Sequence, residues 1–188
     1  MLLLASQSPR RRELLKMLDI PFEVVEIHDV EEIYPEDLQA DHVPEYLSRL
    51  KAAAYKEELK DGDILITADT VVIIDDRLIG KPKDKEDAFR ILSRLSGRVH
   101  RVVTGVTLTS TKKSVTFSSV TDVEFAKLSD EEISYYLDHY HPMDKAGAYG
   151  IQEWIGAVGI AAIDGSFYNV MGLPVHRLYQ ELRLFGAC

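Results

Sequence analysis

The chain has 188 residues, of which 46% are hydrophobic, enough for one core, and a usual domain size of about 150 residues predicts a single domain spanning residues 1–188. With 31 acidic and 22 basic residues, the formal net charge is -9, which argues against nonspecific binding to nucleic acid or to an anionic membrane. The one cysteine, Cys188, excludes an intrachain disulfide, and no apolar stretch approaches the roughly 20 residues of a membrane span, so we expect a soluble cytoplasmic protein.

A short apolar run at residues 2–5 predicts a buried strand, and a helix follows it. Ser8 and Pro9 are typical of an N-cap and of a first helical residue. The apolar positions after them have helical spacing: Leu14, Leu15 and Leu18. The arginines of the stretch "SPRRR" therefore fall on the first helical turn.

The middle of the chain alternates strands and helices. Residues 22–27 predict a second strand, and a helix begins near Pro44, with one apolar face made of Leu47, Leu50 and Ala54. The strongest strand signal is residues 63–75, a run rich in β-branched residues that ends in the turn-forming sequence "DDRL". The next helix has Asp84 as its N-cap and Gly97 as its stop, with apolar residues at helical spacing: Ala88, Ile91, Leu92 and Leu95.

The last third predicts a hairpin and two further helices. Residues 101–110 and 114–125 have the composition of paired strands, and Ser129 with Glu132 predicts a capping box for the helix after them. Residues 174–186 predict an amphipathic C-terminal helix, whereas the glycine-rich stretch before them is too broken by turns to assign. Alternating strands and helices indicate an α/β class with a mixed sheet.

Several catalytic motifs are missing from the sequence. It contains no GxxxxGK[ST] loop, no GxGxxG, no HExxH, no GxSxG and no paired cysteines. Kinase-like, Rossmann, zinc-protease and α/β-hydrolase functions therefore lose support.

Three consecutive arginines, Arg10, Arg11 and Arg12, follow the predicted N-cap. A helix N-terminus presents unpaired backbone N–H groups, so a strand, a serine-rich turn and these arginines together suit a phosphate. Cations there oppose the helix dipole at a cost of roughly 0.3–1 kcal/mol each, which an anionic ligand reverses. The alternative is a solvated basic helix start, and this alternative is weakest for Arg10 and Arg11, which lie nearest the turn.

Asp69 lies inside the strongest predicted strand, where an unpaired carboxylate would cost several kcal/mol. It therefore needs a cation or a proton. An ion pair with one of the lysines, a metal site and a role as general base are the alternatives.

An acidic stretch and two lysines complete the candidate residues. Residues 17–48 contain ten acidic residues and no lysine or arginine, usually the mark of a solvated face. Glu31 and Glu32 nevertheless fall in a predicted loop, where a carboxylate could share a divalent cation with Asp69, because magnesium prefers oxygen ligands and bridges to phosphates. Lys81 in "IGKP" and Lys145 in "MDKAGAYG" are either ordinary surface lysines or the cations that a metal-bound polyphosphate requires.

Five stretches, "LLLASQSPRRRELL", "ADTVV", "GKP", "DKAGAYGIQ" and "NVMGLP", follow one another between residues 2 and 174. In this order they resemble the Maf family of nucleoside triphosphate pyrophosphatases. The resemblance implies a mixed twisted sheet with flanking helices, two lobes around a central cleft and a distant likeness to the inosine triphosphate pyrophosphatases. It also implies a homodimer and a divalent metal cation, magnesium or manganese.

The resemblance also implies roles for single residues. Asp69 becomes the proton acceptor and, with Glu32, a metal ligand; an extra residue before Glu31 leaves Glu31 as the alternative to Glu32. Contacts to the phosphates or the metal fall on Ser6, Arg11, Lys51 and Lys81. Lys145, in the matched stretch "DKAGAYGIQ", is a further candidate for contact with the substrate. Selection of the base falls on Arg10, Thr70 and Gln152, which look like the dTTP/UTP branch rather than the branch acting on 7-methyl-GTP. A glutamine amide suits this role, because it can donate to a uracil or thymine carbonyl and accept from the ring N–H, a pattern that cytosine reverses.

The predicted activity is hydrolysis of dTTP and UTP, and of modified pyrimidine nucleotides, to the monophosphate and pyrophosphate, through metal-assisted attack of water on the α-phosphate. Two other classes stay open. A regulatory or interaction protein linked to inhibition of septum formation does not require Asp69 in a strand. A nucleotide-binding module without catalysis needs the arginines and Gln152 but no base.

Overall fold

The computed structural model describes residues 1–187, and their contacts divide the chain into two compact units. Unit 1 consists of residues 1–70, 104–119 and the chain from residue 172 onward; unit 2 consists of residues 71–103 and 120–171. The single domain expected from the chain length stays a prediction. Among the described residues, no helix is both long and apolar enough to cross a membrane.

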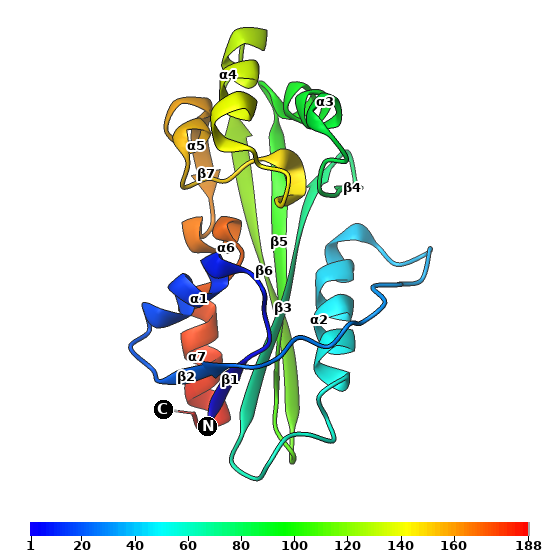
Figure 1. Cartoon of the computed structure of the whole chain (residues 1–188), viewed down its shortest axis with the longest axis vertical. Helices are drawn as coiled ribbons and strands as arrows, with labels where there is room; N and C mark the ends of the chain where they lie inside the picture. The colour runs from blue at the N-terminus through cyan, green and yellow to red at the C-terminus, as the bar shows by residue number, and fades with distance from the viewer. Residues whose placement is uncertain (188) are drawn as a thin grey trace. The chain divides into compact units, whose positions relative to one another are not determined.

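Seven strands form one mixed sheet, with the hydrogen-bonded order β2-β1-β3-β5-β6-β7 and β4 paired to β3 (Figure 1). Their bounds are β1 Leu2–Leu4, β2 Phe22–Val24, β3 Ile64–Ile74, β4 Arg77–Ile79, β5 Val99–Thr109, β6 Ser114–Phe125 and β7 Ile160–Asp164. β1 pairs in parallel with β2 and β3, whereas the β3–β4 and β6–β7 pairs are antiparallel. The predicted α/β class with a mixed sheet and flanking helices is confirmed.

The helices are α1 Pro9–Lys16, α2 Val43–Ala53, α3 Lys85–Leu95, α4 Asp130–Tyr140, α5 Trp154–Gly159, α6 Phe167–Met171 and α7 Val175–Phe185, with short 3-10 turns at Ala40–His42 and Ala146–Ala148. The predicted caps are confirmed: the Ser8 and Asp84 side chains accept from backbone N–H groups of the first turns, and Ser129 and Glu132 make both bonds of a capping box. Short polar side chains at these positions satisfy N–H groups that the helix itself leaves unpaired.

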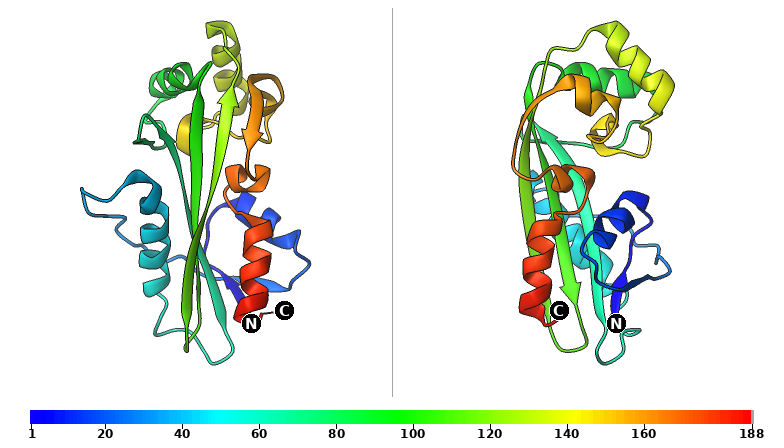
Figure 2. Two further views of the ribbon diagram at one scale, coloured as in Figure 1. Left: turned by 180° about the vertical axis from the view of Figure 1, so that it is seen from behind. Right: turned by 90° about the vertical axis from the view of Figure 1, so that its left-hand side faces the viewer.

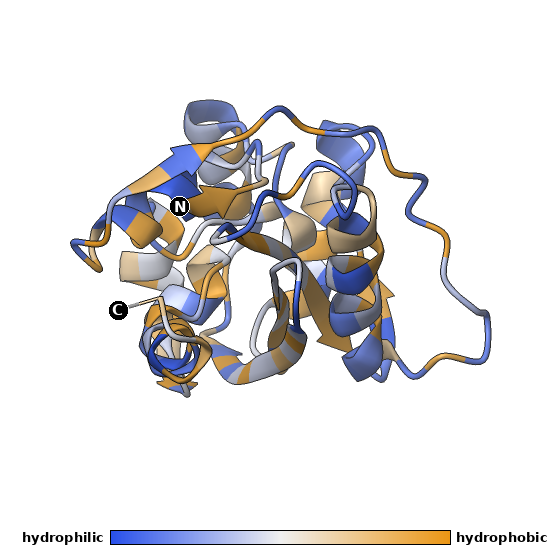
Figure 3. Ribbon diagram, turned by 90° about the horizontal axis from the view of Figure 1, so that it is seen from below, coloured by the Kyte–Doolittle hydropathy of each residue, from blue (hydrophilic) through white to orange (hydrophobic). Residues whose placement is uncertain are grey.

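In unit 1, β1, α1 and β2 are followed by residues 25–39, an extended connection of mixed hydropathy that leads to α2 (Figure 3). β2 ends at Val24, so the strand predicted at residues 22–27 is shorter than expected. The predicted apolar faces of the two helices are confirmed at Leu14, Leu15 and Leu47 and need correction at three other positions. Leu18 lies beyond the end of α1, Leu50 is half-buried, and Ala54 is exposed after the end of α2.

The buried side of α2 contains, besides the predicted Leu47, the residues Val43, Pro44, Ser48 and Ala52. The reason is a close approach between the helix and β5: a Cβ placed on Gly105 would lie 2.3 Å from the Pro44 carbonyl carbon. Only glycine lets the two backbones meet there, and this contact sets which side of α2 faces the sheet. On another part of unit 1, α7 lies alongside β6, where the Arg177 guanidinium lies over the Phe117 ring (Figure 2).

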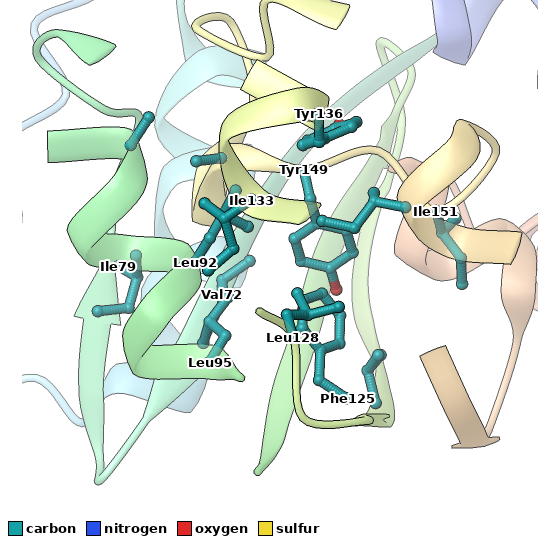
Figure 4. Packing of buried hydrophobic residues seen from close by; sticks show 14 of the residues in the cluster. Val72, Ile79, Leu92, Leu95, Phe125, Leu128, Ile133, Tyr136, Tyr149 and Ile151 are labelled. Carbon is teal, nitrogen blue, oxygen red and sulfur yellow. The ribbon is translucent and has the colours of Figure 1, made fainter. Parts of the chain in front are cut away.

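Unit 2 has an apolar core built around α3, α4 and the ends of the long strands (Figure 4). Its largest fully buried side chains include Tyr136, Phe125, Leu92, Leu95 and Ile133. The glycine-rich stretch at residues 155–174, for which the sequence predicts no element, contains β7, α6 and all but the first residue of α5. These elements have only five or six residues each, too few for a periodic pattern, and they form through packing against the rest of the unit.

Candidate functional site

A row of three charged side chains lies in unit 1, with Lys51 at its centre. The Lys51 Nζ is 2.6 Å from Asp69 Oδ1 and 2.8 Å from Glu32 Oε1. The Asp69 side chain is 13% exposed and that of Glu32 is 52% exposed. One end of the row is therefore enclosed on the middle of β3, and the other end faces solvent from the loop before α2.

Hydroxyl groups fix the register between α2 and the strands that carry this row. The Thr67 hydroxyl donates to the Ser48 carbonyl at 2.8 Å, and the Ser48 hydroxyl shares a hydrogen bond of 2.8 Å with the Thr107 hydroxyl. Ser48 lies one helical turn before Lys51, and Thr67 lies on the same face of β3 as Asp69. These buried hydrogen bonds place the Lys51 ammonium opposite the Asp69 carboxylate.

The Arg11 guanidinium is held within unit 1 by three hydrogen bonds. Its Nε donates to the Gly172 carbonyl at 2.8 Å, one terminal nitrogen donates to the Ala68 carbonyl at 3.0 Å, and the other donates to the Thr70 hydroxyl at 3.0 Å. Burial lowers the pKa of Arg11 from its ordinary value, while Asp69 and Glu32 act in the opposite direction and Arg10 acts in the same direction. The side chain thus clasps the two residues that flank Asp69.

The other predicted unit 1 residues lie close to this clasp. The Thr70 hydroxyl also shares a hydrogen bond of 2.9 Å with Thr104. Ser6 is buried and its hydroxyl accepts from the Ser8 N–H at 3.2 Å, at the entry to α1. Arg10 is half-buried, whereas Arg12 is exposed and lines a groove of about 580 Å³ with Lys16 and residues 19–22 and 24. The three arginines therefore have different surroundings.

Three predicted residues, Lys81, Lys145 and Gln152, lie in unit 2. Lys81 and Gln152 are exposed, and Lys145 is enclosed, with 13% of its side chain exposed. The Gly147 N–H donates to the Gly80 carbonyl at 3.2 Å, so the segments that carry Lys81 and Lys145 are neighbours within the unit.

Two polar residues near Lys145 were not predicted from the sequence: Glu153, which contacts it, and Tyr136, which contacts Glu153. Glu153 pairs with Lys145 at 3.1 Å and accepts a hydrogen bond of 3.0 Å from the Tyr136 hydroxyl. The signal available in the sequence was a glutamate directly after Gln152 in a stretch otherwise poor in charge. Nothing in the sequence connects Tyr136 to it.

The acidic residues of unit 1 have the chemistry that a hard divalent cation requires. Glu32 and Asp69 point carboxylate oxygens at one ammonium, so both could reach one cation, with remaining ligands from water and from substrate oxygens. Within residues 1–187, no group of three or more histidine, cysteine, aspartate or glutamate side chains could hold a metal by itself.

Comparison with known proteins gives a consistent result over nearly the whole chain. Residues 1–185 match the model of the family described as Maf-like protein. A Porphyromonas gingivalis protein named dTTP/UTP pyrophosphatase is 57% identical, over 98% of this chain and 94% of that protein. Proteins of the same name from Parabacteroides distasonis and Bacteroides thetaiotaomicron are 56% and 53% identical, over 98% and 97% of this chain and 95% and 94% of their own lengths.

A more distant likeness is to the solved structure of the Staphylococcus aureus Ham1 protein. It covers 66% of this chain and 71% of that chain, with 18% identity and a TM-score of 0.47. The match to the family model and the identities above 50%, by contrast, extend from β1 to the last helix. The chain belongs to the family of Maf-like proteins.

Proposed function

We propose that this protein hydrolyses dTTP and UTP to the monophosphate and pyrophosphate. The observation that carries the proposal is the Asp69–Lys51–Glu32 row, in a chain more than half identical to proteins named for this activity. A regulatory protein or a passive binding module does not need a carboxylate enclosed on a strand beside an ammonium, and no observation favours those alternatives.

In the proposed mechanism, Asp69 is the general base. It takes a proton from a water molecule, whose oxygen attacks the α-phosphorus, and the bond between this phosphorus and the bridging oxygen to the β-phosphate breaks. Pyrophosphate leaves with the electrons of that bond. Lys51 donates to Asp69 Oδ1, which fixes the carboxylate plane and leaves Oδ2 for the proton. Arg11 supports this geometry through Ala68 and Thr70, on either side of the base.

A divalent cation, magnesium or manganese, belongs to this proposal, with Glu32 and Asp69 as the residues that would hold it. When bound, such a cation neutralises charge on phosphate oxygens. Glu32 is the better candidate than Glu31, because its carboxylate meets the same ammonium as Asp69. Lys51 then keeps its hydrogen bond to Asp69 Oδ1 and exchanges Glu32 for an oxygen of the polyphosphate.

The remaining roles follow the family resemblance. We assign phosphate contacts to Ser6, Lys81 and the two N–H donors of Arg11 that make no hydrogen bond within residues 1–187. Contacts to the nucleotide base are assigned to Arg10, Thr70 and Gln152. A homodimer in the cytoplasm completes the proposal, with size-exclusion chromatography coupled to light scattering as the test of the dimer.

The decisive experiment is hydrolysis of dTTP in water enriched in oxygen-18, with magnesium present. We expect thymidine monophosphate and pyrophosphate, with the label in the monophosphate, because the water oxygen ends on the α-phosphorus. Label in pyrophosphate would move the attack to the β-phosphorus. Thymidine diphosphate with orthophosphate would overturn the proposed reaction, and full activity in excess chelator would overturn the role given to the cation.

A further inference from the structure

A second lysine between two carboxylates lies in unit 2. The Lys145 Nζ is 2.9 Å from Asp144 Oδ1 and 3.1 Å from Glu153 Oε1. The side chains of Lys145 and Glu153 are 13% and 16% exposed, whereas that of Asp144 is 60% exposed. Glu153 is therefore the enclosed partner of this lysine, and Asp144 is its solvated partner.

Tyr136 anchors Glu153 from the protein interior. The Tyr136 hydroxyl donates to Glu153 Oε2 at 3.0 Å, and the hydroxyl oxygen of Tyr136 accepts from the Gly150 N–H at 3.0 Å. The Tyr136 ring is fully buried in the core of unit 2 (Figure 4). Burial raises the pKa of this phenol, so it stays protonated and keeps donating to the carboxylate.

The backbone at Gly150 restricts where the side chains of Glu153 and Lys145 can lie. A Cβ on this residue would lie 2.6 Å from Glu153 Oε1 and 3.0 Å from Lys145 Cε. The carboxylate and the end of the lysine therefore rest directly on the glycine. Tyr136, Gly150 and Glu153 together fix the ammonium more tightly than a surface ion pair would.

Charge decides what this ammonium can bind. With both carboxylates ionised, the group of Asp144, Lys145 and Glu153 carries a net charge of -1, as the Lys51 row does. Here, however, both oxygens of Glu153 already have partners, Lys145 and the Tyr136 hydroxyl, so Glu153 is less suited to hold a cation that would offset the charge of a polyphosphate. An ammonium has three N–H donors, and the two carboxylates take two of them. The third suits an uncharged oxygen acceptor, and Gln152, the candidate for base selection, is the neighbour of Glu153 in the chain.

We infer that Glu153 is a positioning residue that holds Lys145 to contact an uncharged oxygen of the nucleotide, on its base or sugar, rather than the phosphates. This inference rests on the proposed function. It changes the expected role of Lys145 and adds Glu153, with Tyr136 behind it, to the residues that determine substrate binding.

The test compares Glu153→Gln with Asp144→Asn. Each variant removes one negative charge beside Lys145, but it is Glu153 that the buried Tyr136 hydroxyl holds. For Glu153→Gln we expect the KM for dTTP to rise about 5- to 10-fold, the scale of one ordinary hydrogen bond, with kcat changed less than about twofold. Inhibition by inorganic tripolyphosphate, which has no base or sugar, should be unchanged. Asp144→Asn should change either constant by less than about twofold.

Tyr136→Phe supplies a second variant, because it removes the anchor and keeps every charge. We expect its KM for dTTP to rise with no change in tripolyphosphate inhibition, and its melting temperature reports any loss of folding separately. If Lys145 bound phosphates, removal of either carboxylate would strengthen binding of both dTTP and tripolyphosphate, and the inference would be wrong. An unchanged KM in folded Glu153→Gln protein would also overturn it. Wild-type protein that leaves dTTP intact would instead refute the proposed function.

Discussion

Each compact unit holds a lysine between two carboxylates, but the two lysines are supported in different ways. In unit 1, Lys51 joins Asp69 on β3 to Glu32 on a loop, and about half of the Glu32 side chain is exposed. In unit 2, Lys145 pairs with Glu153, which a buried tyrosine anchors. The same charge pattern therefore has two uses: the open row can exchange partners when a ligand arrives, whereas the anchored pair keeps one geometry.

The strongest test of this comparison removes one negative charge beside the lysine of each unit. Asp69→Asn should lower kcat for dTTP by about 10² or more, the usual scale for a general base. Its melting temperature should be unchanged or higher, because Lys51 keeps Glu32 as a partner. The matched variant in unit 2, Asp144→Asn, should retain nearly full activity. Retained activity in folded Asp69→Asn protein would remove Asp69 from the mechanism.

Arg11 adds to the comparison, because in unit 1 a positively charged side chain also holds backbone carbonyls in place. Arg11→Lys cannot keep three hydrogen bonds in a planar fork, so we expect the free energy of unfolding to fall by roughly 1.5–3 kcal/mol. Arg12→Lys, at an exposed position, should change it by less than about 0.5 kcal/mol. Urea unfolding of both variants gives the answer. Equal stability would mean that Arg11 serves only the ligand.

The polar interior of unit 2 can be tested by pH. Burial lowers the pKa of His100 to about 4, and the only hydrogen bond of this ring in the described structure is with the Tyr149 hydroxyl. The unfolded chain, with an ordinary pKa near 6.5, binds the proton more readily. The free energy of unfolding therefore keeps the full contribution of the neutral His100 ring above pH 6.5. This contribution is lost as the pH falls toward 4, and the loss is roughly 2 kcal/mol at pH 5. His100→Gln should remove this part of the pH dependence of unfolding, and an unchanged slope would contradict the assignment.

The smallest expected effect is at the capping box of α4, in unit 2. Ser129→Ala removes the bond from the Glu132 N–H to the serine hydroxyl and should cost about 1 kcal/mol of stability. No candidate residue contacts this cap, so kcat and KM per folded molecule should not change. A loss of activity without unfolding would mean that the helix start affects the Lys145 group.

Local signals in the sequence predicted local structure well. Ser8, Asp84 and Ser129 cap helices as expected, because an N-cap depends on a few adjacent residues. The buried face of α2 was predicted correctly at Leu47 but not at Leu50 and Ala54, since it is set by contact with Gly105, more than fifty residues away in the chain. Periodicity indicates that a helix has an apolar face. It does not show which neighbouring element determines how the helix is turned about its axis.

The candidate site, too, could be predicted from the sequence only in part. An aspartate inside an apolar run indicates that a cation must be near, but only the Ser48 and Thr67 hydrogen bonds determine that Lys51 is that cation. The clasp of Arg11 on Ala68 and Gly172 uses backbone carbonyls, which carry no sequence signature. Catalytic roles for these residues stay predictions until the variants are measured.

The missing side chain of Gly105 has a consequence for evolution and for library design. The α2 backbone rests on this residue at Pro44, and Lys51 follows about 10 Å further along the helix. Any larger residue would push the helix outward and carry Lys51 away from Asp69, although residue 105 has no chemical group to contribute. A deep mutational scan selected for turnover should therefore find that Gly105 tolerates substitution as poorly as Asp69. Directed evolution of the enzyme would have to leave Gly105 unchanged.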